Sequence, residues 1–363
     1  MLLSALSVVF LLSRVFASSA ASCRCSSLTI PVHVNVFVPK DPTDVFAGLK
    51  SNASSLRRVD NIYDIYGVFC QPDPASNQNA NVLQLLVHGF TYTSQYWSPP
   101  VEEFRNYSYM AFSCDRGLSS LAVDWLGVGL STRPLNASDV QYPTVSDALS
   151  QVARHLKTVS ILPGLEPFRK IIGVGHSAGS GLLNFGVIVD GAQSPFDGLI
   201  LTGSLMVGPG DEPPPQLFLS ARDDTPLRWG AIDPGYITTD QRALFYPSDP
   251  TAFSPRMLIF DNLVKDTGTM SIFSQTATTS LMTEYTGPVA RIVGSEDQLF
   301  CAGTDRCVDV VSLTAAERVL WPAAKSFDVV VAQGSGHDLN LDFFADGPFH
   351  TFVRFVTQFI GPV

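Results

Sequence analysis

Apolar runs alternate with longer stretches of mixed polarity along most of this chain. Near the N-terminus, polar and apolar residues alternate in Pro31–Val38, which predicts a half-exposed strand, and Asn61–Cys70 is expected to be its antiparallel neighbour. The later runs are almost continuously apolar, as strands buried on both faces are. These runs are Val82–His88, Leu118–Asp124, Ile171–Gly175, Phe196–Leu201, Val289–Gly294 and Phe327–Ala332.

Helix-like stretches separate most of these runs. Strands that alternate with helices predict an α/β fold in which helices flank a mostly parallel central sheet. A chain of 363 residues accommodates either two average domains or one large α/β domain with an insertion. The main helices are expected at Thr144–Ser160, Gly179–Asp190, Ala315–Leu320 and Phe349–Ile360.

One gap interrupts the alternation between the sixth and seventh strands. More than eighty residues, dense in proline, separate Thr202 from Val289. A structureless loop of that length is unusual in a compact domain. The gap also contains enough Phe, Leu, Met, Trp and Tyr to pack against something, so we interpret it as an inserted cap. The expected division is a signal peptide at 1–22, a first core part at 23–208, the cap at 209–287 and a second core part at 288–363.

Composition narrows the possible partners. Hydrophobic residues make up 45% of the chain and charged residues 15%, which favours a sizeable core over disorder. The net charge of -10, without a basic cluster, argues against nucleic acid and anionic membranes. Basic residues of the predicted cap are scattered, which argues against a clamp for phosphate or coenzyme A. We expect a small, mostly apolar ligand, and no obligate protein partner is inferred.

The first residues have the features of a secretion signal. The apolar run Leu2–Leu12 is followed by the small residues Ala17–Ser22, which suit signal-peptidase cleavage near Cys23. The run is shorter than the roughly 20 residues that a membrane span needs. Because no other stretch is long and apolar enough, the mature chain is expected to be secreted without a membrane span. Sequons at Asn52, Asn106 and Asn136 offer sites for N-glycans on that route.

The six cysteines agree with a secretory route. An even count favours disulfides, and six cysteines allow 15 pairings, which the sequence does not distinguish. Cys301 and Cys307 bracket a short loop and are the local candidate pair. A zinc site is the alternative, but no histidine lies near these cysteines at ligand spacing.

The segment Gly175-His176-Ser177-Ala178-Gly179 is the strongest chemical signal. It follows an apolar strand and precedes an apolar helix, so Ser177 is expected on a sharp turn that exposes its hydroxyl. A bare hydroxyl is a poor nucleophile until a base removes its proton and a third group orients that base. In chains with this turn, the expected order is serine, acid, histidine.

His337 and Asp297 are the candidate base and acid. His337 lies in a glycine-rich loop after the last strand, whereas His350 falls in the final helix, where a packed or surface histidine is expected. Glu296 and Asp297 follow the strand Val289–Gly294, and only one of these adjacent carboxylates is able to reach the imidazole.

An oxyanion formed at the serine requires two fixed N–H donors. Ala178, the residue after the nucleophile, supplies one, and Phe90, after Gly89 at the end of an earlier strand, is expected to supply the other. The neighbouring His88 is interpreted as structural.

Taken together, the segments Leu86–Phe90, Ala122–Ser131, Gly173–Gly179, Gly294–Asp297 and Gly336–His337 resemble successive blocks of the α/β-hydrolase superfamily, roughly from Val32 to Ile360. The resemblance implies a Ser177–Asp297–His337 triad, because Asp297 holds the family's usual acid position. A serine nucleophile argues against the dehalogenase and epoxide-hydrolase branches, which place aspartate there. The segment Ser26–Asn81 is longer than the family's usual start.

The resemblance implies hydrolysis of a carboxylic ester without a metal or organic cofactor. The same residues also serve lactones, thioesters, amides and acyl transfer, and a catalytically inactive binding protein is the alternative of another class. More narrowly, the chain is similar to secreted, glycosylated fungal α/β-hydrolases, some of which act on esters of secondary metabolites.

Overall fold

An eight-stranded sheet forms the centre of the structure, a computed structural model that describes residues 23–42, 53–73, 81–206, 217–275 and 280–359. Its strand order is β1-β2-β4-β3-β5-β6-β10-β11. β2 is antiparallel to both β1 and β4, and every other neighbouring pair is parallel, as predicted. The strands are β1 Cys23–Pro39, β2 Leu56–Pro72, β3 Val82–Val87, β4 Ser119–Val123, β5 Lys170–His176, β6 Gly198–Thr202, β10 Val289–Gly294 and β11 Phe327–Ala332.

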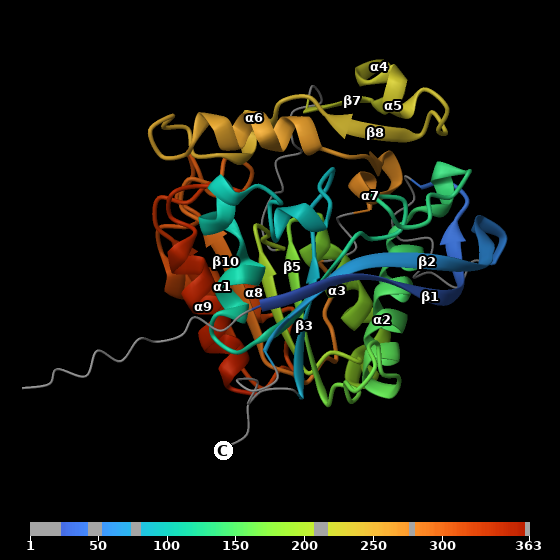
Figure 1. Ribbon diagram of the computed structural model, residues 1–363, viewed down its shortest axis with the longest axis horizontal. Helices are drawn as coiled ribbons and strands as arrows, with labels where there is room; N and C mark the ends of the chain where they lie inside the picture. The colour runs from blue at the N-terminus through green and yellow to red at the C-terminus, as the bar shows by residue number, and fades with distance from the viewer. Residues whose placement is uncertain (1–22, 43–52, 74–80, 207–216, 276–279, 360–363) are drawn as a thin grey trace, which may run out of the picture.

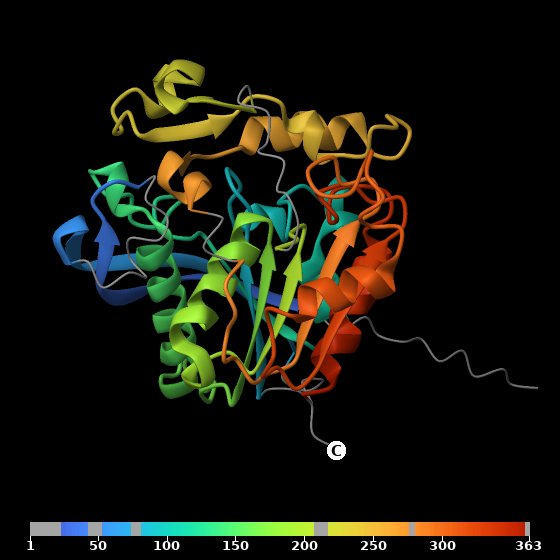
Figure 2. The same ribbon diagram turned by 180° about the vertical axis from the view of Figure 1, so that it is seen from behind.

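Helices cover both faces of this sheet (Figures 1 and 2). Alternate residues of a strand therefore enter different cores: Leu85 packs in the cluster under α2 and α3, whereas Leu86 packs in the cluster under α1 and α9. This two-sided burial explains why the central strands are continuously apolar. The flanking helices are α1 Tyr109–Cys114, α2 Tyr142–Thr158, α3 Ala178–Asp190, α8 Val310–Arg318 and α9 Asp346–Thr357.

The predicted elements are all present within the described residues, with shifted ends. The largest shift is at β1, which starts at Cys23 instead of Pro31 because it pairs with β2 along its whole length. Helix α8 starts at Val310 instead of Ala315 because the Asp309 side chain accepts bonds from Val311 N (3.0 Å) and Ser312 N (3.1 Å). Helix α9 starts at Asp346 and takes Pro348 into its first turn, where proline is tolerated.

The N-terminal segment forms a long hairpin at one edge of the sheet. β1 and β2 pair along their whole length, but only the part Gly67–Cys70 of β2 pairs with β4. The rest of the hairpin lies beside α2, where Gln151 Nε2 donates to His33 O (2.8 Å). Disulfides join Cys25 to Cys70 across the hairpin and Cys23 to Cys114 at the end of α1.

The residues 217–275, called here the inserted segment, lie across the carboxyl ends of the parallel strands (Figures 1 and 2). A small antiparallel sheet, β7-β8-β9, lies within it. Its prolines do not make it structureless, because Pro226 and Pro255 begin helices, where a missing N–H costs nothing. Its elements are β7 Phe218–Ser220, α4 Ala221–Asp224, α5 Pro226–Trp229, β8 Tyr236–Thr239, α6 Pro255–Val264, β9 Gly268–Thr269 and α7 Met270–Ser274.

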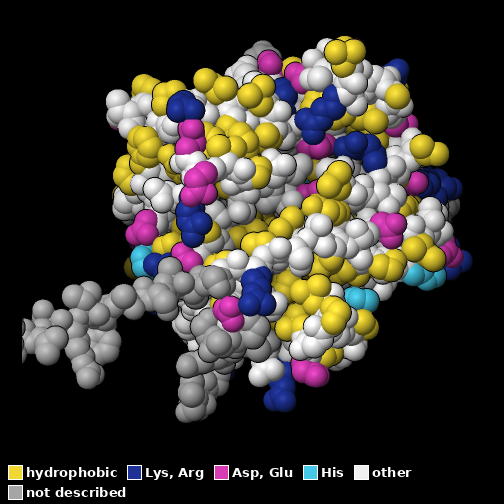
Figure 3. Space-filling model, in the orientation of Figure 1, with side chains coloured by type: hydrophobic (Ala, Val, Ile, Leu, Met, Phe, Trp, Pro, Cys, Tyr) yellow, Lys and Arg dark blue, Asp and Glu magenta, His cyan; other side chains and the backbone are white. Residues whose placement is uncertain are grey.

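On the face drawn in Figure 3, Lys and Arg side chains are dispersed among Asp and Glu, with apolar side chains between them. Across the part of the chain that the structure describes, no helix is both long and apolar enough to cross a bilayer.

Candidate active site

Ser177 lies on a strained turn between β5 and α3. Its backbone has φ +50° and ψ -118°, a conformation that non-glycine residues rarely adopt. The flanking glycines are needed for close approach. A Cβ on Gly175 would lie 2.6 Å from Ser180 N, and one on Gly179 would lie 2.3 Å from the carbonyl oxygen of Val87. The turn therefore fixes the serine next to the end of β3.

A chain of hydrogen bonds connects the three residues that the sequence singles out. His337 Nε2 lies 2.9 Å from Ser177 Oγ, and His337 Nδ1 lies 2.9 Å from Asp297 Oδ2. Asp297 and His337 are buried, whereas Ser177 is partly exposed. The hydrogen bonds of the imidazole among the described residues go to Asp297 and Ser177 and not to Glu296, whose carboxylate accepts the Ser295 hydroxyl (3.3 Å). A serine hydroxyl, an imidazole and a buried carboxylate in this order are arranged to transfer a proton from the hydroxyl to the ring.

The turn after β10 holds the Asp297 carboxylate. Oδ1 accepts bonds from Leu299 N (2.9 Å) and Phe300 N (3.2 Å), which leaves Oδ2 for His337. The main-chain oxygen of Asp297 accepts a bond from Cys301 N (2.8 Å), and a disulfide joins Cys301 to Cys307. The local cysteine pair that the sequence favours is therefore present, and it closes the loop next to the acid.

The N–H groups of Phe90 and Ala178 are the sequence's candidates for an oxyanion site. Neither donates to an acceptor among the described residues. The Gly89 carbonyl oxygen accepts bonds from His88 Nδ1 (2.8 Å) and Tyr92 N (3.3 Å). Because C=O and N–H point in opposite directions across a trans peptide, these two bonds also set the direction of the Phe90 N–H.

His88 supports this peptide as a neutral ring. Trp125 N donates to its Nε2 (3.4 Å), so the proton lies on Nδ1 and is donated to the Gly89 oxygen. Burial lowers the pKa of His88 to about 4. The ring also stacks on Trp125 with centroids 5.3 Å apart. His88 therefore has a structural position, as the sequence suggests. His350, the other histidine that follows Ser177, lies on α9 with its side chain 58% exposed.

Comparison with known proteins identifies the family of this chain. A model of the alpha/beta hydrolase family matches residues 84–353. The chain belongs to the alpha/beta hydrolase family.

Solved structures of other hydrolases share the fold. An esterase from Exiguobacterium antarcticum is 16% identical (TM-score 0.52, 81% of this chain and 96% of that one). A soluble variant of monoglyceride lipase from Saccharomyces cerevisiae, in complex with a substrate analog, is 14% identical (TM-score 0.57, 82% and 92%). A thermophilic esterase from Thermogutta terrifontis is 13% identical (TM-score 0.53, 91% and 98%). No curated protein sequence matches the chain.

The loop that carries His337 in this hydrolase is held by a second buried carboxylate. Asp342 accepts bonds from Gly336 N (2.9 Å) and Phe344 N (2.8 Å). Burial raises the pKa of Asp342 to about 7. Neither the loop's length nor its composition marks this residue among the acids of the sequence.

Sequence reasoning also missed a buried polar cluster between the core and the inserted segment. The residues are far apart in the chain, so no motif connects them. Burial lowers the pKa of His176 well below its usual value, and burial together with the Asp261 carboxylate raises the pKa of Asp338 well above its usual value. The cluster contains Tyr92, His176, Arg242, Tyr246, Asp261 and Asp338.

Aromatic rings of the inserted segment lie next to the candidate site residues. The Phe245 ring lies 5.3 Å from the His337 ring, and the Phe218 ring lies 5.1 Å from that of Phe90. Phe273 is 4.8 Å from Phe218 and completes a group of three rings. Others, such as Trp229, are buried. Some aromatics of the insertion therefore lie at the site, and others pack within the protein.

Proposed function

We propose that this hydrolase cleaves a carboxylic ester of a small, mostly apolar molecule through an acyl-enzyme on Ser177. The observation that carries the proposal is the hydrogen-bonded chain from Ser177 through His337 to Asp297. The strained turn at Ser177 supports it. So do the N–H groups of Phe90 and Ala178, which donate to no acceptor among the described residues.

In the first half of the proposed reaction, Ser177 Oγ attacks the ester carbonyl carbon while His337 Nε2 takes the hydroxyl proton. Asp297 accepts the Nδ1–H and stabilises the imidazolium that forms. The carbonyl oxygen becomes an oxyanion that the Phe90 and Ala178 N–H groups bind. The carbon–oxygen bond to the alcohol then breaks, and His337 returns the proton to the departing alkoxide.

In the second half, water replaces the alcohol. His337 Nε2 removes a proton from the water as it attacks the acyl carbon, and the same two N–H groups bind the second oxyanion. Collapse releases the carboxylic acid and returns the proton to Ser177 Oγ. Every proton removed is given back, so a hydrolytic cycle consumes one water and one ester.

We propose that the inserted segment is a cap, within the limits 209–287, whose side chains select the substrate. The Phe90, Phe218 and Phe273 rings next to the proposed oxyanion site favour apolar or aromatic groups. Lys265, a cationic residue of the segment, is bound to Asp224 (3.0 Å) and is not free to pair with an anionic substrate. Neutral esters are therefore the favoured class.

We propose that the chain is secreted after removal of residues 1–22, which lie outside the described residues. Its six cysteines all form disulfides, which suits an oxidising compartment. Asn106 and Asn136 are exposed, as glycan sites must be, and Asn52 lies outside the described residues. Protein secreted from a eukaryotic host should begin near Cys23 and lose mass on glycosidase treatment. An intact Met1 would contradict this part of the proposal.

A panel of chromogenic esters with graded acyl length tests the activity. Ser177→Ala and His337→Ala should each lower kcat by about 10⁶-fold, and the double variant should lose little more, because the residues act as a unit. Asp297→Asn should lower kcat less than Ser177→Ala does. Glu296→Gln is the matched control and should retain turnover. If Glu296→Gln is the damaging change, the acid is assigned wrongly.

A further inference from the structure

The turn that carries Phe90 is held by residues of the inserted segment. Thr91, the next residue, has φ +61°, which is costly for a β-branched side chain. Its carbonyl oxygen accepts a bond from Asp266 N (2.9 Å), and its hydroxyl contacts Thr239 Oγ1. Both partners belong to the inserted segment, so the core does not hold this strained residue alone.

Arg242 is the centre of these contacts. Its Nη1 donates to Thr91 Oγ1 (2.9 Å), and its guanidinium lies 3.8 Å from the centre of the Tyr92 ring. Its Nε and Nη2 donate to the two oxygens of Asp261 at 3.2 and 2.5 Å, which fixes the plane of the group. The side chains of Arg242 and Asp261 are only 1% and 2% exposed. A buried arginine thus contacts both residues that follow Phe90.

The two residues that Arg242 contacts control the neighbouring peptide. The Thr91 hydroxyl donates to the Phe90 carbonyl oxygen (2.7 Å), and Tyr92 N donates to the Gly89 oxygen (3.3 Å). That second bond belongs to the peptide whose N–H is the proposed oxyanion donor. Movement of Thr91 or Tyr92 would therefore rotate the Phe90 N–H.

The short helix that begins at Arg242 and the residue after it also contact the loops that carry His337 and Asp297. The Phe245 carbonyl oxygen accepts a bond from Asp338 N (2.8 Å), next to His337. The Tyr246 carbonyl oxygen accepts a bond from Gln298 Nε2 (2.8 Å), next to Asp297. One stretch of the insertion therefore touches three of the four loops from which the proposed machinery is built.

We propose that Arg242 is a positioning residue, which holds the Gly89–Tyr92 turn through Thr91 and Tyr92 so that the Phe90 N–H is ready for the oxyanion. This inference rests on the proposed ester hydrolysis and adds a role for the inserted segment beyond lining the pocket. Arg242 has no contact with the reacting atoms in this role, and it acts on kcat through the turn.

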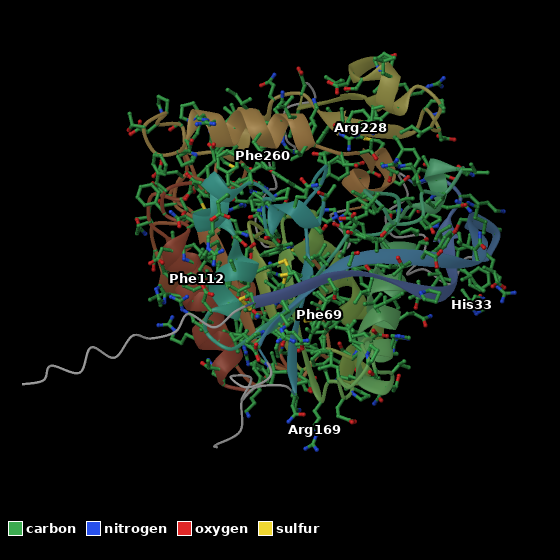
Figure 4. The ribbon with its side chains drawn as sticks, in the orientation of Figure 1. His33, Phe69, Phe112, Arg169, Arg228 and Phe260 are labelled. Carbon is green, nitrogen blue, oxygen red and sulfur yellow. A yellow bond between two sulfur atoms is a disulfide. The ribbon has the colours of Figure 1, made fainter. Side chains whose placement is uncertain are left out.

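The test compares Arg242→Met with Arg256→Met. Arg256 is another arginine of the inserted segment, on the helix α6 that also carries Phe260, which Figure 4 labels, and it forms an ion pair with Glu103 (2.7 Å). 4-Nitrophenyl acetate is the substrate, because its acyl group is short. Arg242→Met should lower kcat by about 10- to 100-fold and leave KM nearly unchanged. This loss of kcat is smaller than the ~10²–10³-fold loss that follows removal of a whole oxyanion donor. Arg256→Met should retain wild-type kcat even if its melting temperature falls.

Two further measurements separate positioning from stability. A trifluoromethyl ketone forms a tetrahedral anion on an active serine, so Arg242→Met should weaken its binding in proportion to the loss of kcat. In a double-mutant cycle, Thr91→Val should lower kcat much less in the Arg242→Met background than in the wild type. Arg242→Lys keeps the charge but not the paired donors, and it should fold and still lose kcat.

The outcomes are distinct. If Arg242→Met and Arg242→Lys are less heat-stable but keep wild-type kcat and ketone affinity, the positioning role is wrong and the proposed function stands. If the effects of Arg242→Met and Thr91→Val are fully additive, action through Thr91 is wrong. If the wild type and Arg256→Met fail to turn over any neutral ester, the proposed function fails and the inference with it.

Discussion

The same substitution at two glycines of α3 should have opposite effects. A Cβ added to Gly179 would lie 2.3 Å from the Val87 oxygen and 2.5 Å from the His88 oxygen. Ordinary contact begins at 3.4 Å, so α3 and the end of β3 must separate by about 1 Å. Both obstacles are main-chain atoms, so no side chain is able to rotate away. Overpacking of this kind costs about 1–3 kcal/mol of folding free energy.

The separation would also damage the proposed oxyanion site. Ala178 precedes Gly179, and Phe90 follows the displaced end of β3 by three residues, so the two N–H donors would move apart. A misplacement of about 1 Å lowers a rate by about 10²-fold. Gly179→Ala should therefore lower kcat for a neutral ester by about that factor and lower the midpoint of urea unfolding.

Gly186→Ala is the control within the same helix. The nearest atom to its added Cβ would be Ser150 Oγ at 3.5 Å, an ordinary contact, and Gly186 lies inside α3. Alanine in a helix interior is favoured over glycine by about 0.5–1 kcal/mol, so this variant should be more stable with unchanged kcat. Wild-type kcat in Gly179→Ala, or equal stability changes in the two variants, would refute the reasoning.

Two other predictions concern the loops of the acid and the base. Replacing Cys301 and Cys307 together by serine should lower the free energy of unfolding by about 2 kcal/mol. It should also reduce kcat, because the loop that holds Asp297 loosens. An unchanged kcat would contradict the role of this disulfide in holding Asp297. The folded pKa of Asp342, about 7, exceeds its unfolded value of about 3.9, so the folded state keeps a proton that the unfolded state has lost. The stability of the wild type relative to Asp342→Asn, measured by urea unfolding, should therefore fall between pH 4 and pH 7, and a difference that grows with pH would refute the assignment.

The sequence predicts the fold where burial leaves a local signal. Val82–His88 and the other apolar runs are strands because both sheet faces are covered, and the observed β3 differs by one residue. The start of α8 is missed because a single cap at Asp309, instead of apolar periodicity, determines it. Two of the three disulfides depend on how β1, β2 and α1 pack, so only the Cys301–Cys307 loop is accessible to local reasoning.

The candidate site also contains residues with a local sequence signal and residues that only packing brings together. Ser177, His337 and Asp297 follow strands in recognisable turns, so their proximity is predictable once the strands are known to be parallel. Arg242 and Asp261 are different, because they lie far apart in the sequence and belong to no motif. Only the packing of the inserted segment onto the core brings Arg242 to Thr91, and no periodicity encodes that contact.

The most direct test of the proposed mechanism is to trap the acyl-enzyme. Wild-type protein mixed with excess 4-nitrophenyl butyrate and quenched in acid within the first turnover should carry one butyryl group, and peptide mapping should place it on Ser177. The release of nitrophenolate should show a burst of one equivalent per enzyme, and Ser177→Ala should show neither adduct nor burst. An adduct on another residue, or full turnover by Ser177→Ala, would contradict the account.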